Sequence, residues 1–136
     1  MKPISEVYAN ERWGWSDYQP MLESFGFKIV LQVDDGDYQG DSRVLFQDGA
    51  RYGHVVFGWG SCSGCDALQA AGSLSDVDEI RQGIFRDIHW EPDAAAMLAY
   101  FETRDWEGQY CWHAEETREY VDRAKILLRS GEEKTS

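Results

Sequence analysis

The stretch that decides the fold is RVLFQDGARYGHVVFGW, residues 43–59. Its two halves, residues 43–47 and 51–59, are rich in β-branched and aromatic residues, which favour strands. Between them lies Asp48-Gly49, a dipeptide that supplies the positive φ angles of a tight hairpin. The stretch therefore predicts two antiparallel strands joined by a short turn.

A further strand is predicted immediately before this hairpin. Residues 27–34 alternate between apolar and polar side chains, with Val30 interrupting the polar face. The alternation is typical of a half-buried strand, whose apolar face would consist of Phe27, Ile29, Leu31 and Val33. The three strands, within about residues 27–59, are expected to form an antiparallel meander.

The apolar periodicity changes after the third strand, from about two residues to about 3.6. Residues 76–89 carry one apolar stripe, with Ser75 and Asp78 placed as a capping box. Asp93 is placed to cap a second helix, and a third is predicted from about 114 to 129. Strands first and helices afterwards favour an α+β fold, with three to four helices packed on the three-stranded meander.

Composition limits the class of protein. The chain has 136 residues, of which 43% are apolar, and 25 acidic against 13 basic residues give a net charge of −12. We expect one globular domain over residues 1–130 and a flexible tail at 131–136. Direct binding of nucleic acid or an anionic membrane is not expected, because phosphate binding requires clustered Lys and Arg. Without a signal peptide or a membrane-spanning run, the protein is expected to be cytoplasmic.

The most distinctive local feature is GWGSCSGCD, residues 58–66, a turn rich in glycine and serine. It precedes a short predicted helix, and a helix N-terminus lowers the pKa of a thiol placed on it. Cys62 and Cys65 are therefore candidates for a thiol redox pair. Cysteine-centred catalysis is a second interpretation, with Cys62 as nucleophile assisted by Asp66 or His113.

Two further interpretations of this turn need no catalysis. The first is a Cys₃His zinc site, because the extended segment around residue 112 could present two ligands on one side. Its ligands would be Cys62, Cys65, Cys111 and His113. The second is a sharp strand-to-helix turn in which two small thiols pack beneath the glycines, without any cofactor.

The same block resembles a family of small uncharacterised bacterial and phage proteins. The resemblance rests on the run GSCSGCDAL after a YGxVxFGW strand, on Arg104-Asp105-Trp106, and on Tyr110-x-Trp112-His113, and it covers about residues 13–113. It implies no activity, but it does imply a possible origin in a phage or mobile element. It also implies that the position of Cys111 is often not cysteine, which weakens the four-ligand zinc site.

The acidic residues are unevenly distributed, since residues 61–136 hold 16 acids and 8 bases. Six tryptophans exceed what a core of this size can hide, and Trp is enriched in binding hot spots. We therefore expect a binding module, rather than an enzyme, that engages a basic protein partner on its helical side, although an aromatic face could equally form a homodimer. The candidate partner-binding residues are Trp106, Trp112, Glu115 and Glu116.

Two remaining groups of polar residues are expected to be unremarkable. The four aspartates at 34, 35, 37 and 41 predict a solvated acidic loop; they lack the ligand order of an EF-hand calcium loop. His54 and His89 are expected to face solvent or to fill hydrogen-bonding positions.

Overall fold

The computed structural model describes residues 2–8, 18–36, 40–59, 68, 71–106 and 114–135. They form an α+β fold, as predicted, around a four-stranded antiparallel sheet in the order β1-β2-β3-β4. The strands are β1 (Lys28–Asp34), β2 (Gly40–Asp48), β3 (Arg51–Trp59) and β4 (His89–Glu91). The helices are α1 (Ile4–Val7), α2 (Gln19–Glu23), α4 (Leu74–Asp87), α5 (Ala94–Thr103) and α7 (Ala114–Thr135).

The predicted hairpin is present. β2 and β3 pair without a break from Gly40 opposite Trp59 to Asp48 opposite Arg51. Gly49 has a φ of 62°, the left-handed conformation that glycine adopts without strain. The turn residues thus fix the register of the two central strands.

The β1 strand differs from its predicted pattern because it contains a bulge. Its pairing with β2 shifts between Ile29 and Leu31, so that Val30 is an extra residue. Ile29 then packs on one face of the sheet, whereas Leu31 and Val33 pack on the other. The prediction of a single apolar face over residues 27–34 was therefore wrong, and Val30, which seemed to interrupt the pattern, marks the change of face.

The fourth strand, β4, was not predicted. It follows α4 directly and pairs with β3, with Trp90 opposite Gly53. A Cβ atom at Gly53 would lie 2.7 Å from Ile88 Cγ2 and 2.9 Å from the Trp90 ring. Glycine at this position therefore allows β4 and its preceding residue to approach the sheet closely.

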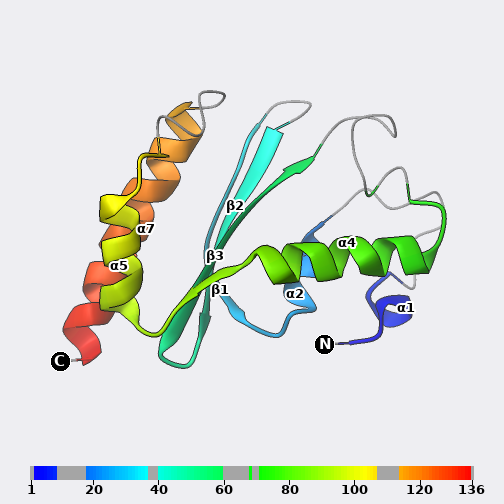
Figure 1. The fold of residues 1–136 in the computed structure, drawn as a ribbon, viewed down its shortest axis with the longest axis horizontal. Coiled ribbons are helices and arrows are strands. Elements are labelled where there is room, and N and C mark those ends of the chain that lie inside the picture. Colours follow the sequence, from blue (N-terminus) through cyan, green and yellow to red (C-terminus); the bar gives the residue numbers. More distant parts are fainter. Residues whose placement is uncertain are drawn as a thin grey trace.

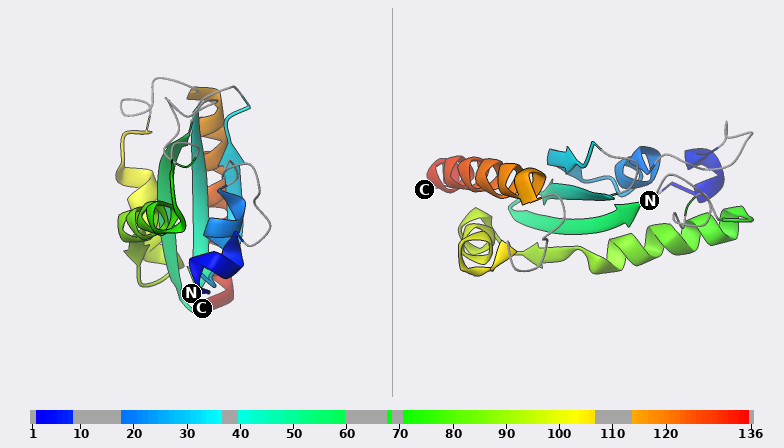
Figure 2. Two further views of the ribbon diagram at one scale, coloured as in Figure 1. Left: turned by 90° about the vertical axis from the view of Figure 1, so that its right-hand side faces the viewer. Right: turned by 90° about the horizontal axis from the view of Figure 1, so that it is seen from above.

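Helices cover both faces of the sheet (Figures 1 and 2). α5 and α7 pack on one face in a cluster that includes Leu45, Met97, Phe101, Tyr120, Ala124 and Leu128. α1, α2 and α4 pack on the other face in a cluster that includes Met21, Leu22, Phe46, Val55, Val77 and Ile84. The bulge in β1 lets that strand contribute apolar side chains to both clusters.

The helix ends show which capping predictions hold. Asp93 accepts a hydrogen bond from the Ala96 amide at the start of α5, as predicted. α4 is capped by Ser73, whose hydroxyl accepts from the Asp76 amide, so the predicted box two residues later was wrong. The two candidates share the same spacing, which alone cannot choose between them. α7 extends to Thr135, beyond its predicted end near residue 129.

Candidate functional site

The cysteine block cannot be placed in this fold. Cys62, Cys65 and Asp66 lie outside the described residues, as do Cys111, Trp112 and His113. Within the described ranges, no group of three or more His, Cys, Asp or Glu side chains could hold a metal ion. The redox, catalytic and zinc interpretations therefore remain predictions.

His54 lies at the centre of the sheet face that α5 and α7 cover. It is 4% exposed, and its Nδ1 shares a hydrogen bond of 2.7 Å with the hydroxyl of Tyr120 on α7. Burial, and then the positive charges of Arg104 and His89, lower the pKa of His54 from 6.5 to about 3. The imidazole is therefore neutral at physiological pH and links β3 to α7.

Aromatic side chains enclose this histidine. The rings of Phe101, Trp106 and Tyr120 have centroids 5.2–5.5 Å from that of His54. Trp106 is 7% exposed, and its indole nitrogen donates to the Phe101 carbonyl oxygen. This enclosure explains why the charged imidazolium is unfavourable here.

A buried ion pair lies on the same face. Arg43, 1% exposed, donates from Nη1 to Asp35 Oδ1 at 2.8 Å and from Nε to Thr117 Oγ1 at 3.2 Å. Asp35 also accepts a hydrogen bond from the Asp41 amide. A Cβ atom at Gly40 would lie 2.5 Å from Asp35 Oδ2, so glycine there leaves room for this carboxylate.

These polar groups hold elements together and are shielded from solvent. Asp35 is 4% exposed, so the prediction of a solvated loop was wrong for this residue. Its partner Arg43 lies eight residues away across the β1–β2 pair, and burial of a carboxylate requires such a partner. For His54, the hydrogen-bonded alternative is the one observed.

The predicted partner-binding residues within the described ranges lie near the start of α7. Glu115 is exposed and Glu116 is half-buried in its first turn. Trp106 is largely enclosed by its neighbours, so only a small part of its indole reaches the surface. Acidic residues near a helix N-terminus also stabilise the helix dipole, which gives Glu115 and Glu116 a structural role as well.

A different acidic surface is evident in the fold. In the right-hand view of Figure 2, α4, β4 and α5 run along the β4 edge of the sheet, whereas α1, α2, β1 and α7 run along the β1 edge. Residues 74–105 carry eight acids and three bases, all eight acids being at least partly exposed. We call these acids the β4-side surface: Asp76, Asp78, Glu79, Asp87, Glu91, Asp93, Glu102 and Asp105.

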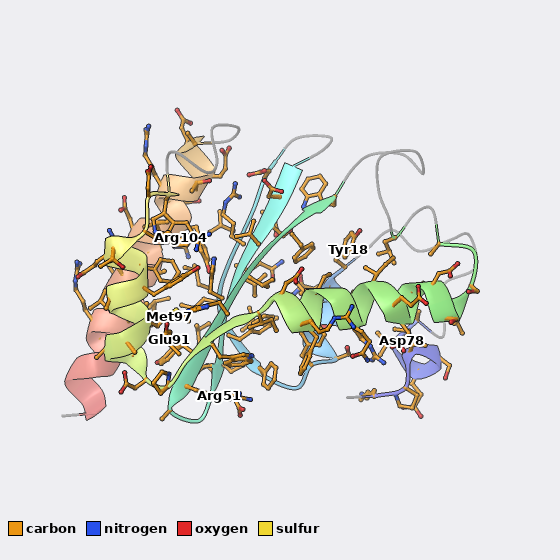
Figure 3. The ribbon with its side chains drawn as sticks, viewed as in Figure 1. Tyr18, Arg51, Asp78, Glu91, Met97 and Arg104 are labelled. Atoms are coloured by element: carbon orange, nitrogen blue, oxygen red, sulfur yellow. The ribbon has the colours of Figure 1, made fainter. Side chains whose placement is uncertain are left out.

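One of the three bases is removed from this surface by burial. Arg81 is 5% exposed; it donates to Asp78 Oδ1 at 2.6 Å and to the Lys2 carbonyl oxygen at 2.6 Å. Asp78 and Glu91 are labelled in Figure 3. Glu79 and Asp87, by contrast, have no ionic partner among the residues that the structure describes.

Sequence reasoning found the excess of acid but not its position. It assigned the charge to the helical half as a whole, including α7. In α7, however, six acids are accompanied by five bases, so this helix is nearly balanced. The missing information was the edge of the sheet along which each helix lies.

No family model, curated protein or solved structure shows significant similarity to this chain. The resemblance carried by the Gly-Ser-Cys-Ser-Gly-Cys-Asp block therefore stays a prediction. Every helix in the described part of the chain is too short or too polar to cross a membrane.

Proposed function

We propose that this protein is an interaction module that binds a basic protein partner through the β4-side surface. The observation that carries the proposal is the charge of this surface once burial is considered. Eight acids are exposed at least in part, whereas Arg81 is buried, so Arg86 and Arg104 are the surface bases of residues 74–105.

Such a surface acts mainly on the encounter between two proteins. Complementary charge steers association and raises its rate, and the effect falls as salt increases. Glu79 lies in the first half of α4, and Asp87 is its last residue. Neither forms an ion pair with another described residue, so both charges are available to Lys or Arg of the bound protein. The strand β4 links α4, which carries four of these acids, to α5, which carries Glu102, along this edge of the sheet.

The test is capture followed by kinetics. The full chain is immobilised, proteins retained from a bacterial lysate are identified, and each purified candidate is measured for its association rate at several salt concentrations. The triple variant Glu79→Gln, Asp87→Asn and Glu102→Gln is expected to slow association of the basic partner about three- to tenfold at low salt. Salt should reduce that difference, because about 0.15 M salt screens exposed charges beyond roughly 8 Å.

The matched control removes the same charge from the opposite side. Asp34→Asn, Glu23→Gln and Glu119→Gln alter three exposed acids outside residues 74–105, none of them on α1, which contacts α4. This control is expected to leave the association rate within about twofold, since its sites are screened from the contact. Equal loss in both variants, or a partner without a basic surface, contradicts the proposal.

A further inference from the structure

A pocket of about 280 Å³ lies between the C-terminal end of α5 and the first turns of α7. From α7 it is lined by Thr117, Val121 and Lys125 among others, spaced four residues apart. Residues at this spacing share one flank of a helix. The pocket is therefore a feature of how α7 is set against the residues that follow α5.

The walls of this pocket combine an apolar part with a charged part. Trp106, Ala114 and Val121 supply apolar lining. The charged lining comprises three bases and two acids, which are Arg104, Arg118, Lys125, Asp105 and Asp122. Small-molecule sites usually combine an apolar wall with a few polar groups, and this pocket, with five charged residues among nine, has the more polar composition that a charged ligand requires.

The excess of positive charge in this lining contrasts with the net charge of −12 for the whole chain. Lys125 is half-buried on α7, and it has no ion-pair partner within 4 Å among the described residues. Asp122, three residues earlier, is exposed and does not pair with it. The Lys125 ammonium is thus available to a ligand.

A second observation comes from behind the pocket wall. Thr117, which lines the pocket, accepts a hydrogen bond from Arg43 Nε. Arg43 Nη2 is buried and has no hydrogen-bond partner among the described residues. Because Nε and Nη2 share one edge of the planar guanidinium, this second donor faces the same side as the bond to Thr117. A buried donor left unpaired is costly, so a polar group drawn into this region would be stabilised.

We propose that this pocket binds a small organic anion, a carboxylate or phosphate on an apolar body. Lys125 holds the anionic group, and the apolar body packs against Trp106 and Val121. The pocket shares Asp105 with the β4-side surface, but its anion site on α7 does not depend on the proposed protein partner.

The test uses three probes on the full chain: phenyl phosphate, benzoate and inorganic phosphate. Calorimetry gives the affinities, and amide NMR shifts locate the site. At least one of the two aromatic anions is expected to bind with a dissociation constant below about 1 mM, and inorganic phosphate alone about tenfold more weakly. The shifts should concentrate in residues 114–125. No aromatic anion binding at about 10 mM, or tighter binding of inorganic phosphate, overturns the assignment.

Three variants of α7 sharpen the test. Lys125→Gln is expected to weaken binding of the aromatic anion about tenfold, since it removes a charge-assisted contact. Asp122→Asn should strengthen binding, because it removes a negative charge from the lining. Arg123→Gln removes an exposed base of the same helix outside the lining and should change the affinity less than about twofold. Equal weakening by Lys125→Gln and Arg123→Gln overturns the proposal, and unchanged helical circular dichroism shows that the variants are folded.

Discussion

Acid should destabilise this protein through His54 in a way that a single substitution removes. His54 is neutral in the folded state because burial, and then Arg104 and His89, lower its pKa to about 3, whereas the unfolded chain has the ordinary value of 6.5. The unfolded state therefore binds a proton that the folded state rejects. Neutral His54 is therefore accommodated without cost above pH 6.5, and the folded state loses stability relative to the unfolded state as the pH falls from 6.5 toward 3.

The size of the effect follows from these two pKa values. At pH 5 the unfolded histidine is almost fully protonated, and the folded one is still neutral. Since one pKa unit corresponds to about 1.4 kcal/mol, His54 should lower the free energy of unfolding by about 2 kcal/mol between pH 7.5 and pH 5. Carboxylates also titrate over this range, so the His54 contribution is obtained as a difference between two proteins.

Urea denaturation at pH 7.5 and pH 5 measures that difference. His54→Gln keeps a polar side chain opposite Tyr120 but cannot titrate, so its loss of stability on acidification should be about 2 kcal/mol smaller than in the wild type. Tyr120→Phe is the control. It removes the 2.7 Å hydrogen bond and should cost about 1–2 kcal/mol at both pH values, while the burial that lowers the pKa remains. A His54→Gln profile as steep as that of the wild type, or an NMR titration of His54 with a midpoint near 6.5, would refute the reasoning.

Three other perturbations test the packing, the buried charges and the cysteines. Gly53→Ala should lower the free energy of unfolding, measured in urea, by about 1–3 kcal/mol, because the added methyl group overfills the β3–β4 contact. Gly83→Ala in α4, where an added Cβ atom meets nothing within 4 Å, should raise it by about 0.5–1 kcal/mol. Equal effects of the two variants would contradict the packing described at Gly53. Asp35→Ala should cost about 3–5 kcal/mol because it leaves the Arg43 charge buried and unpaired, and adding Arg43→Met should recover part of that loss. A double variant less stable than Asp35→Ala alone would show that the pair is not the cause. For the cysteine turn, the zinc interpretation predicts that element analysis finds about one zinc ion per chain in the wild type and none in Cys62→Ser. Absence of zinc from both proteins, together with an alkylation rate whose pH dependence is the same in both, would exclude this interpretation.

Local sequence signals predicted the parts of the fold that local chemistry determines. Asp48-Gly49 determined the hairpin because its turn needs a residue in the left-handed conformation, and Gly49 adopts that conformation. Asp93 capped α5 because its carboxylate accepts a hydrogen bond from the Ala96 amide in the first turn. Both outcomes depend on residues within three positions of each other.

The bulge and the fourth strand could not be predicted in the same way. An extra residue at Val30 changes the face of every residue after it, and only the pairing with β2 reveals it. β4 has three residues, which is too short for any periodicity to appear. Its pairing depends on Gly53, more than 30 positions earlier in the chain, where the missing side chain leaves space.

The buried polar residues were missed for a related reason. Asp35 belongs to an acidic run, and such runs are usually solvated, yet its carboxylate is buried in an ion pair with Arg43 of β2. His54 alternates with apolar residues in β3, and the pattern does not show that Tyr120 of α7 meets it. A charged or polar residue at an inward position of a strand is the available signal, but its partner becomes known only with the tertiary structure.

Burial also changes what the net charge of the chain means for binding. Arg43 and Arg81 are enclosed, and Arg43 takes one carboxylate, Asp35, inside with it. Arg81 is paired with Asp78, whose side chain remains 39% exposed. Among the described residues, the interior therefore holds two arginines and one aspartate, so the exposed side chains of this part of the chain are more acidic than its sequence count indicates. A basic partner meets this stronger field on the β4-side surface, while the lining of the α7 pocket holds more bases than acids. The two sites can therefore be separated experimentally, because Glu79, Asp87 and Glu102 lie outside the pocket lining. Neutralising these three acids should slow the protein partner without abolishing anion binding, and Lys125→Gln should do the reverse.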